Sequence, residues 1–319
     1  MALDLDGIAL VDHHAHGVLR AQPSLDGFRG LFSESPDPRQ WPHIATGVTY
    51  RRAIRELADL FGVEPTEEAV HAHRLATEPR EYARRLVAET NTELLLLDDG
   101  YPTTDVGTSW EEFAAWVGVS ARPVLRLETH ALEDATGARE RGYAALKTIA
   151  AYRGGLDRAS EHVVAALEAN EASGDPLPVQ VHCGFGDSDV HLSRADPSHL
   201  KPLVERFRET PFVLLHCYPF VREAGWLAHV YGNVWFDLSL TIPHVSQPAQ
   251  AVREALELAP VSKLLYASDA ARTPELYYLA ARWWRRALAE VLPELLPEGE
   301  VEGAARLILR ENARALYRL

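Results

Sequence analysis

Eight short apolar segments recur along the chain and alternate with longer amphipathic stretches. We predict that the apolar segments are strands, at residues 8–16, 93–101, 122–130, 143–152, 177–184, 211–218, 233–241 and 263–270. Between them, stretches such as 157–174 and 197–209 have a helical pattern. Strands that alternate with helices pair in parallel. Eight such units predict an α/β fold, a closed (β/α)8 TIM barrel, with an open doubly wound sheet as the alternative.

Residues 20–90 interrupt this rhythm, because they are too many for one connection between strands. They contain helical patterns such as "TYRRAIRELADLFG", so we expect a helical insertion after the first strand that covers the site as a cap. The tail after residue 271 is helical in pattern, and no linker rich in proline, glycine or serine marks a second domain. We therefore expect residues 1–319 to form a single barrel domain.

Charge and composition limit the classes of partner and the compartment that this chain suits. The formal net charge of −14 argues against nucleic acid or an anionic membrane as a partner. The opening "MALDLDGIALVD" lacks the basic region of a signal peptide, and no apolar run approaches the roughly 20 residues of a membrane helix. Two cysteines suit a reducing compartment. We expect a cytoplasmic protein that acts on a small molecule, and the composition leaves open whether it forms a homo-oligomer.

The stretch "VDHHAHGVL" at 11–19 places three histidines within four positions. Alternation on a strand predicts that Asp12, His14 and His16 share one face and that His13 points the other way, toward the outer helices. A His-x-His pair on a strand suits a transition metal. The alternative for an isolated pair is two core histidines with hydrogen-bond partners.

The pair is not isolated, because polar residues also stand near the carboxyl ends of three later strands. These are His182, His216 and Asp269, in the fifth, sixth and eighth segments. In a barrel, the carboxyl ends of the strands share one rim, where active sites lie. Buried polar groups need partners, and a shared metal supplies them. The set therefore predicts a metal centre.

Lys147 lies inside the apolar fourth segment, in "AALKTIA". Burial favours the neutral amine of a lysine. A neutral amine can take up carbon dioxide to form a carbamate, an anion that can bridge two cations. The alternative is that Lys147 pairs with a substrate carboxylate, or with Asp98 or Asp99.

These residues and their surroundings resemble the amidohydrolase superfamily, and within it the amidohydrolase-2 branch. The stretches that carry the resemblance are "LKTIAAYRGGL" (146–156), "PVQVHCGFGDSD" (178–189), "LLHCYPF" (214–220), "LYASDA" (265–270) and "RENARALY" (310–317). They are most similar to the domain that FluG-type proteins carry beside glutamine-synthetase-like modules. The segment 20–90 matches only loosely.

The resemblance implies one of two metal sites. In the binuclear version, the first metal takes His14, His16 and Asp269, the second takes His182 and His216, and carbamylated Lys147 bridges them. In the mononuclear version, one metal takes His14, His16, His182 and Asp269, and His216 is free for acid–base work. Lys147 favours two metals. Zinc is the first expectation, with manganese or iron as alternatives.

The leading functional hypothesis is hydrolysis of a C–N bond, an amide, in a small substrate that carries a carboxylate. A bound metal brings the pKa of water down to about 7, which supplies hydroxide at neutral pH. Asp269 would act as the general acid and base, and His216 or a second metal would polarise the carbonyl. The resemblance suggests a γ-glutamyl amide. Among nucleophile motifs, the sequence contains no Gly-x-Ser-x-Gly elbow.

Four residues on loops after strands are candidates for substrate binding: Arg153, Asp187, Tyr218 and Arg272. Arginine suits a carboxylate because its guanidinium group binds two oxygens at once. Each of the four could instead be a helix cap or part of a surface ion pair.

Two other functions use the same residues. The first is non-oxidative decarboxylation of a small aromatic or unsaturated acid at a mononuclear site that does not need Lys147. The second is a non-catalytic metal-binding partner protein. The complete set of ligands argues against the second function.

Overall fold

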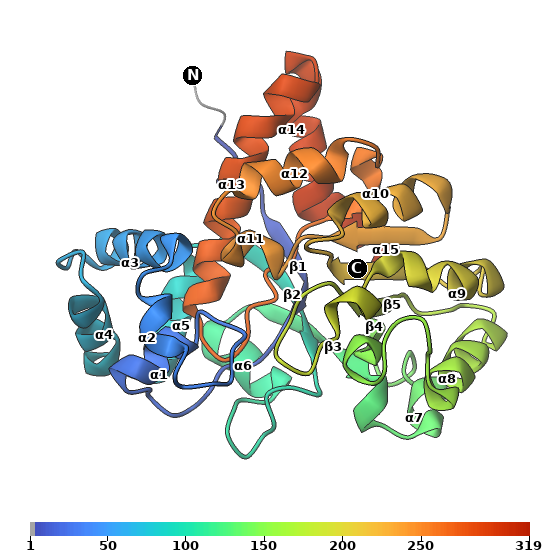
Figure 1. Cartoon of the computed structure of the whole chain (residues 1–319), viewed down its shortest axis with the longest axis horizontal. Coiled ribbons are helices and arrows are strands. Elements are labelled where there is room, and N and C mark those ends of the chain that lie inside the picture. The colour runs from blue at the N-terminus through green and yellow to red at the C-terminus, as the bar shows by residue number, and fades with distance from the viewer. Residues whose placement is uncertain (1–3) are drawn as a thin grey trace.

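A computed structural model describes residues 4–319 and shows a barrel of parallel strands with helices around it (Figure 1). The strands are β1 (Leu10–Ala15), β2 (Thr92–Asp98), β3 (Ser120–Arg126), β4 (Ala145–Thr148), β5 (Val179–Cys183), β6 (Phe212–His216), β7 (Val234–Asp237) and β8 (Leu264–Leu265). Each pairs in parallel with the next, in the order β1 to β8. The predicted (β/α)8 barrel is confirmed, and each strand pairs over fewer residues than its apolar segment spans.

Helices fill the connections and cover the outside of the barrel. The α-helices are α1 (Leu25–Gly30), α2 (Trp41–Ile44), α3 (Val48–Phe61), α4 (Glu67–Ala76), α5 (Pro79–Ala88), α6 (Trp110–Val117), α7 (Leu132–Thr136), α8 (Glu161–Ala172), α9 (Lys201–Arg206), α10 (Val221–Val230), α11 (Thr241–His244), α12 (Pro248–Leu256), α13 (Glu275–Leu295), α14 (Glu298–Arg306) and α15 (Asn312–Tyr317). Short 3-10 turns are η1 (Leu127–Thr129), η2 (Ala150–Tyr152), η3 (Leu192–Arg194), η4 (Pro197–Leu200) and η5 (Val261–Lys263), and a π-helical stretch, η6 (Leu307–Glu311), joins α14 to α15. Within residues 4–319, no helix has the length and apolar character needed to cross a membrane.

Helices α1 to α5 all lie between β1 and β2, and they form the lobe at the left of Figure 1. A buried ion pair joins this lobe to the barrel: Nη1 of Arg74 lies 2.6 Å from Oε1 of Glu275, at the start of α13. The hydroxyl groups of Thr273 and Tyr82 also contact this pair, Thr273 with Arg74 at 2.7 Å and Tyr82 with Glu275 at 2.9 Å. Because a buried charge that loses its partner is costly, this contact fixes the lobe beside the segment that follows β8.

The barrel closes through backbone hydrogen bonds between β1 and the segment after β8. The amide of Asp269 donates to the carbonyl of His14 at 3.0 Å, and the amide of His16 donates to Ala270 at 2.9 Å. A short parallel bridge between Val18 and Arg272 continues this seam. The seam therefore brings together two segments that lie at opposite ends of the sequence.

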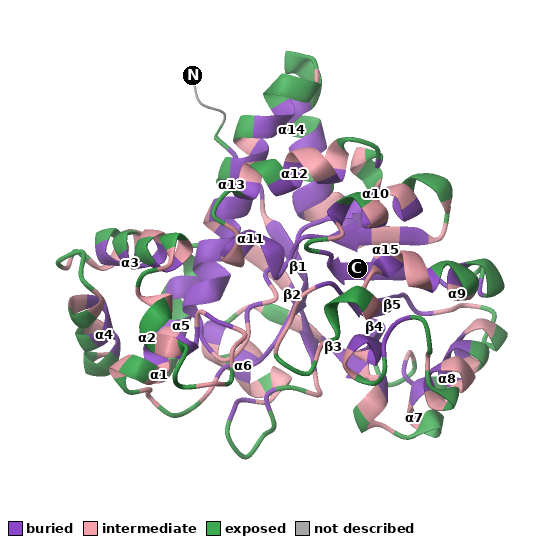
Figure 2. Cartoon of the chain, viewed as in Figure 1, coloured by how far each residue is buried: buried purple, intermediate pink, exposed green. Residues whose placement is uncertain are grey.

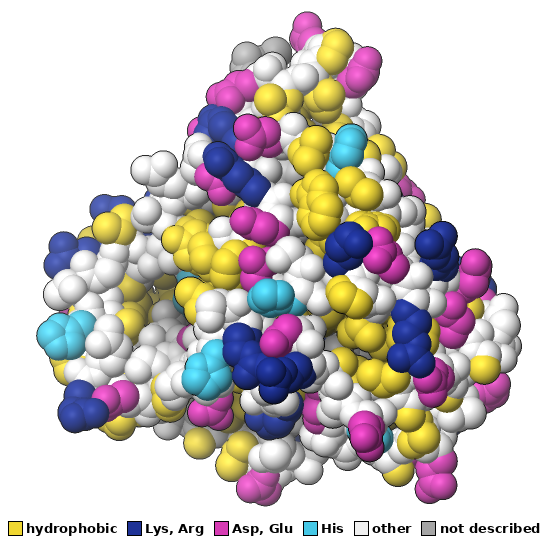
Figure 3. All heavy atoms as spheres, turned by 45° about the vertical axis from the view of Figure 1, so that its right-hand side comes forward, with side chains coloured by type: hydrophobic (Ala, Val, Ile, Leu, Met, Phe, Trp, Pro, Cys, Tyr) yellow, Lys and Arg dark blue, Asp and Glu magenta, His cyan; other side chains and the backbone are white. Residues whose placement is uncertain are grey.

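The amino-terminal end of the barrel is filled by apolar side chains. Val11, Val124 and Val213 pack there with Ala313 and Tyr317 of the C-terminal helix α15. Figure 2 shows buried residues along the strands and on the helix faces turned toward them, with exposed residues on the outer faces. On the face shown in Figure 3, acidic and basic side chains are interspersed. The cavity that matters for function lies at the other, carboxyl end of the strands.

The predicted alternation along β1 is wrong at His13. The His13 carbonyl accepts a hydrogen bond from Gln180 of β5 at 2.7 Å, and its Nε2 lies 3.0 Å from Asp237 of β7. Nε2 of His14 lies 3.0 Å from Nζ of Lys147 of β4. None of these strands neighbours β1, so both imidazoles reach their partners across the barrel interior.

The physical reason is an irregularity in strand pairing, since the register between β1 and β2 shifts between Asp12 and Ala15. This shift breaks the strict alternation of side chains. The Asp12 carboxylate accepts hydrogen bonds from the amide and hydroxyl of Ser268, at 2.9 and 2.5 Å, and interacts with His14 through the backbone of His14. Asp12 thus supports the segment that carries Asp269.

Gly184, which directly follows β5, has no side chain, and the backbone of Tyr218 therefore lies close to it. Its φ is +81°, and an added Cβ would lie 2.2 Å from the carbonyl oxygen of Tyr218. Gly174 has a similar φ of +75° but open space around it. We predict that Gly174→Ala lowers the free energy of unfolding by about 1 kcal/mol through backbone strain alone. Gly184→Ala should cost about 3 kcal/mol or more, because the backbone must also move.

Urea unfolding of the two variants beside the wild type measures this difference. Equal losses in the two variants would contradict a close approach at Gly184.

Candidate metal centre

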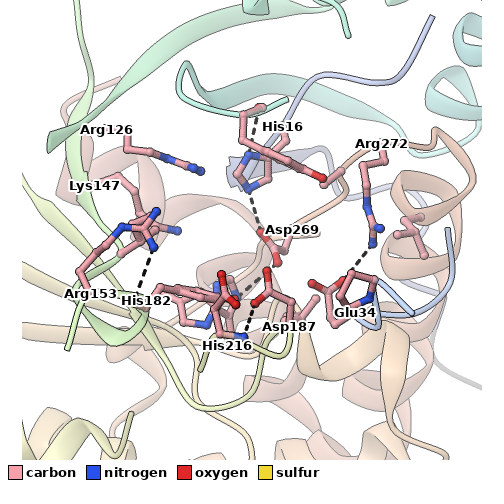
Figure 4. Close-up of a pocket in the computed structure, with 18 residues that line it drawn as sticks. His16, Glu34, Arg126, Lys147, Arg153, His182, Asp187, His216, Asp269 and Arg272 are labelled. Atoms are coloured by element: carbon pink, nitrogen blue, oxygen red, sulfur yellow. Dashed lines mark hydrogen bonds and ion pairs between the residues drawn. The ribbon is translucent and has the colours of Figure 1, made fainter. Parts of the chain in front are cut away.

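The structure brings six predicted residues together at the carboxyl end of the barrel. They are His14, His16, Lys147, His182, His216 and Asp269, and Figure 4 labels all of them except His14. Oδ1 of Asp269 lies 3.1 Å from Nε2 of His14 and 3.2 Å from Nε2 of His16. The rings of His182 and His216 meet edge to face, with centroids 4.5 Å apart. The convergence places nitrogen and oxygen donors around one small space.

Two of these side chains depend on a strained backbone. Leu215 packs in the apolar cluster inside the barrel, so simple alternation would turn His216 outward. His216 instead has a φ of +69°, and Asp269 has a φ of +47°. Residues other than glycine rarely adopt this left-handed conformation, and it costs free energy that the surrounding structure must offset. Strain of this kind is concentrated at functional sites, which supports the assignment of a site here.

Burial controls the protonation of the imidazoles and the amine. It lowers the pKa of His14 to about 4, with the charge of Lys147 adding to the effect. Burial likewise lowers the pKa of His182 to about 3. It also lowers the pKa of Lys147, against the smaller opposing effect of Asp98. Neutral imidazoles bind metals, and a lowered lysine pKa favours the amine that forms a carbamate.

The pKa of the Asp269 carboxyl is also lowered, but by neighbouring imidazoles and not by burial. Burial alone would raise the pKa of this carboxyl, but the nearby His216 and the hydrogen bonds from His14 and His16 hold the pKa well below its usual value. Asp269 is therefore an anion at neutral pH. Its charge lies where three imidazoles converge, which is the arrangement that a cation requires.

The residues present fit a divalent metal. Two groups of donor atoms lie within 4.8 Å of one another: His14, His16 and Asp98, and His14, His216 and Asp269. Nδ1 of His14 is buried and has no hydrogen-bond partner among the described residues. The nitrogen of His14 that faces Asp269 is Nε2, so a metal held together with Asp269 would take Nε2 rather than Nδ1. Imidazole and carboxylate donors suit zinc, manganese or iron.

Above these residues lies a cavity of about 330 Å³. Three of the four predicted substrate-binding residues line it: Arg153, Asp187 and Arg272. Nη2 of Arg272 pairs with Oε1 of Glu34 at 3.1 Å. Among the described residues, no carboxylate pairs with Arg153, whose guanidinium group donates only to the backbone carbonyl of Tyr152 at 3.3 Å. Arg153 is thus the basic side chain that is available for a bound anion.

The fourth predicted residue, Tyr218, is not among the residues that line this cavity, and its role in substrate binding stays a prediction. The side chain is 45% exposed, and its ring meets Phe185 edge to face. Cys217 has a φ of +67°, which turns the chain so that the carbonyl of Tyr218 faces β5 and accepts from the amide of Phe185 at 2.8 Å. The backbone of Tyr218 thus supports the segment that follows β5.

Several lining residues were missed by the sequence analysis: Glu34, Tyr101, Arg126 and Tyr152. Arg126 ends the apolar run of β3, which is the same signal that identified His182. It pairs with buried Asp98 at 2.7 Å, and among the described residues Lys147 makes no ion pair with Asp98. Glu34 lies in the insertion, where no local pattern points to a site.

Comparisons with known proteins agree with this geometry. Residues 11–319 match the family model described as amidohydrolase. The chain is 28% identical to the protein fluG of Emericella nidulans, in an alignment that covers 97% of this chain and 46% of fluG. It therefore spans about half the length of that curated relative.

Solved structures show the same fold. A proposed metal-dependent hydrolase from Lactobacillus casei ATCC 334 is 26% identical, with a TM-score of 0.87 over 98% of this chain and 96% of that one. A uronate isomerase from Bacillus halodurans C-125 is 12% identical, with a TM-score of 0.68 over 98% of this chain and 94% of that one. The second likeness shows the fold alone.

Proposed function

Since this chain belongs to the amidohydrolase family of metal-dependent enzymes, we propose that it hydrolyses a C–N bond, an amide, in a small substrate that carries a carboxylate. One observation carries the proposal. An anionic Asp269 shared by His14 and His16 lies beside the buried amine of Lys147, at the base of a cavity where Arg153 has no carboxylate partner.

We propose that a divalent metal, zinc first and manganese or iron as alternatives, binds to these residues. His14, His16 and Asp269 would hold one ion, His182 and His216 a second, and Lys147 would bridge the two as a carbamate. The Lys147 amine adds to carbon dioxide and loses a proton to form this anion. When bound, a metal lowers the pKa of water to about 7 and polarises a carbonyl.

The chain's own residues then carry the remaining steps. Asp269 is an anion within hydrogen-bond distance of two imidazoles, so it can accept a proton from the attacking water. It then delivers that proton to the leaving nitrogen, which departs as a neutral amine or ammonia. Arg153 binds the substrate carboxylate through two parallel hydrogen bonds. The γ-glutamyl amides are the first substrates to consider, because they combine an amide with a carboxylate.

The direct test is the release of ammonia or amine from a panel of acid amides, with γ-glutamyl compounds first. We predict hydrolysis by the metal-loaded wild type, loss after chelation, and recovery after reloading with zinc or manganese. Asp269→Asn should lower kcat by about 10²-fold or more, since it removes a proton-transfer group and alters a proposed metal ligand. Release of carbon dioxide from small aromatic or unsaturated acids, with no amide cleaved, would replace this proposal with decarboxylation.

Arg153→Gln tests the carboxylate contact. Charge-assisted hydrogen bonds contribute about 1.5–3 kcal/mol, so KM for an acid amide should rise about 10- to 100-fold. Arg158 is the matched control: its side chain is 81% exposed, it lies on the same loop, and it does not line the cavity. Steady-state kinetics of Arg153→Gln and Arg158→Gln should therefore differ in KM. Equal KM values for the wild type and Arg153→Gln would remove Arg153 from the substrate site.

A further inference from the structure

A chain of buried polar residues runs beneath the cavity and connects His216 to the C-terminal helix α15. It passes from His216 through Ser239, Asp237 and His13 to Tyr317, and all five residues are at most 2% exposed. The proposed reaction uses His216 but gives no role to the other four. Buried polar networks are costly unless every member is satisfied, so the pattern of donors and acceptors is informative.

The carboxylate of Asp237 fixes the direction of the hydrogen bonds near His216. Its Oδ1 accepts from the amide of His216 at 2.6 Å, and from the amide and hydroxyl of Ser239 at 2.9 and 2.7 Å. The Ser239 hydroxyl has one proton, and it donates that proton to Asp237. Nδ1 of His216 lies 2.7 Å from the same hydroxyl oxygen and must therefore be the donor.

The far end of the chain of polar residues reaches Asp237 through His13. Gln180 donates to the Tyr317 hydroxyl at 3.1 Å, and that hydroxyl lies 3.0 Å from Nδ1 of His13. The other ring nitrogen of His13 lies 3.0 Å from Oδ2 of Asp237. Neither Nε2 of His13 nor Oδ2 of Asp237 has a hydrogen-bond partner among the described residues, so this contact is close but is not a hydrogen bond. The hydrogen-bond donors all approach Oδ1 of Asp237, and His13 packs beside Oδ2.

We propose that Ser239 and Asp237 are positioning residues that hold the proton of His216 on Nδ1 and leave Nε2 as the free nitrogen, while His13 packs against Asp237 from below. The nearest competing group agrees with this assignment: Oδ2 of Asp269 lies 3.6 Å from the same Nδ1 and favours a proton there. The tautomer is independent of the reaction. Its value for metal binding or proton transfer rests on the proposed function.

A fixed tautomer matters because only the unprotonated nitrogen of a neutral imidazole can bind a metal or accept a proton. Partners that hold the other N–H group usually contribute about 10- to 100-fold in metal affinity or activity. We therefore expect Ser239→Ala to lower kcat by that factor with little change in KM, since the Ser239 side chain does not line the cavity.

Thr241 supplies a matched control. Its buried hydroxyl donates to the backbone carbonyl of His216 at 2.6 Å, so Thr241→Val removes a hydroxyl bound to the same residue without touching the ring. The measurement is nitrogen NMR of the full-length protein labelled with 15N-histidine, in the zinc-loaded and the metal-free forms. The His216 signals are assigned by their absence in His216→Gln.

The wild type should show one His216 tautomer, with the proton on Nδ1, and Thr241→Val should keep it. Metal-free Ser239→Ala should show a mixture of the two tautomers. A wild-type proton on Nε2, or an unchanged tautomer in Ser239→Ala, would overturn the inference. A shift of tautomer in a protein that hydrolyses no amide would uphold the inference while removing the proposed function.

Discussion

The hydrogen bonds that close the barrel between β1 and the segment after β8 also build the site. The amide of Asp269 donates to the carbonyl of His14, and the carboxylate of the same residue contacts the His14 and His16 rings. His16 and Asp269 are 253 positions apart in the sequence. Closing the barrel and assembling the proposed ligands are therefore one structural event, and a change that opens the seam would separate the ligands.

The interior of the barrel is divided by polarity. Apolar side chains and the helix α15 fill the amino-terminal end, and the imidazoles, Lys147 and Asp269 occupy the carboxyl end. Between them lies the polar chain of His13, Asp237 and Ser239. Two departures from regular structure make this possible, the register shift in β1 and the left-handed backbone at His216. The hydrogen bonds around Asp237 compensate for burying its charge.

The sequence predicted what depends on local pattern. Apolar runs located all eight strands, and the polar residues at their ends identified His182, His216 and Asp269, because parallel strands in a barrel end on one rim. The sequence-based prediction was wrong for the side chain of His13. The register shift arises from the pairing of β1 with β2, and the residues of β1 alone do not indicate it. The direction of the Tyr218 side chain was likewise beyond the sequence, since it follows from the backbone at Cys217. Glu34 reaches the cavity only through the tertiary placement of the insertion.

Metal content per chain shows whether these residues hold metal. Elemental analysis should be made on wild type and Lys147→Ala grown with added zinc or manganese and bicarbonate. The account predicts close to two ions per wild-type chain and close to one in Lys147→Ala, because the bridging carbamate is lost. One ion in both proteins would contradict the bridge and recast His216 as the acid–base group. No ion in the wild type, even after reloading, would contradict the metal centre itself.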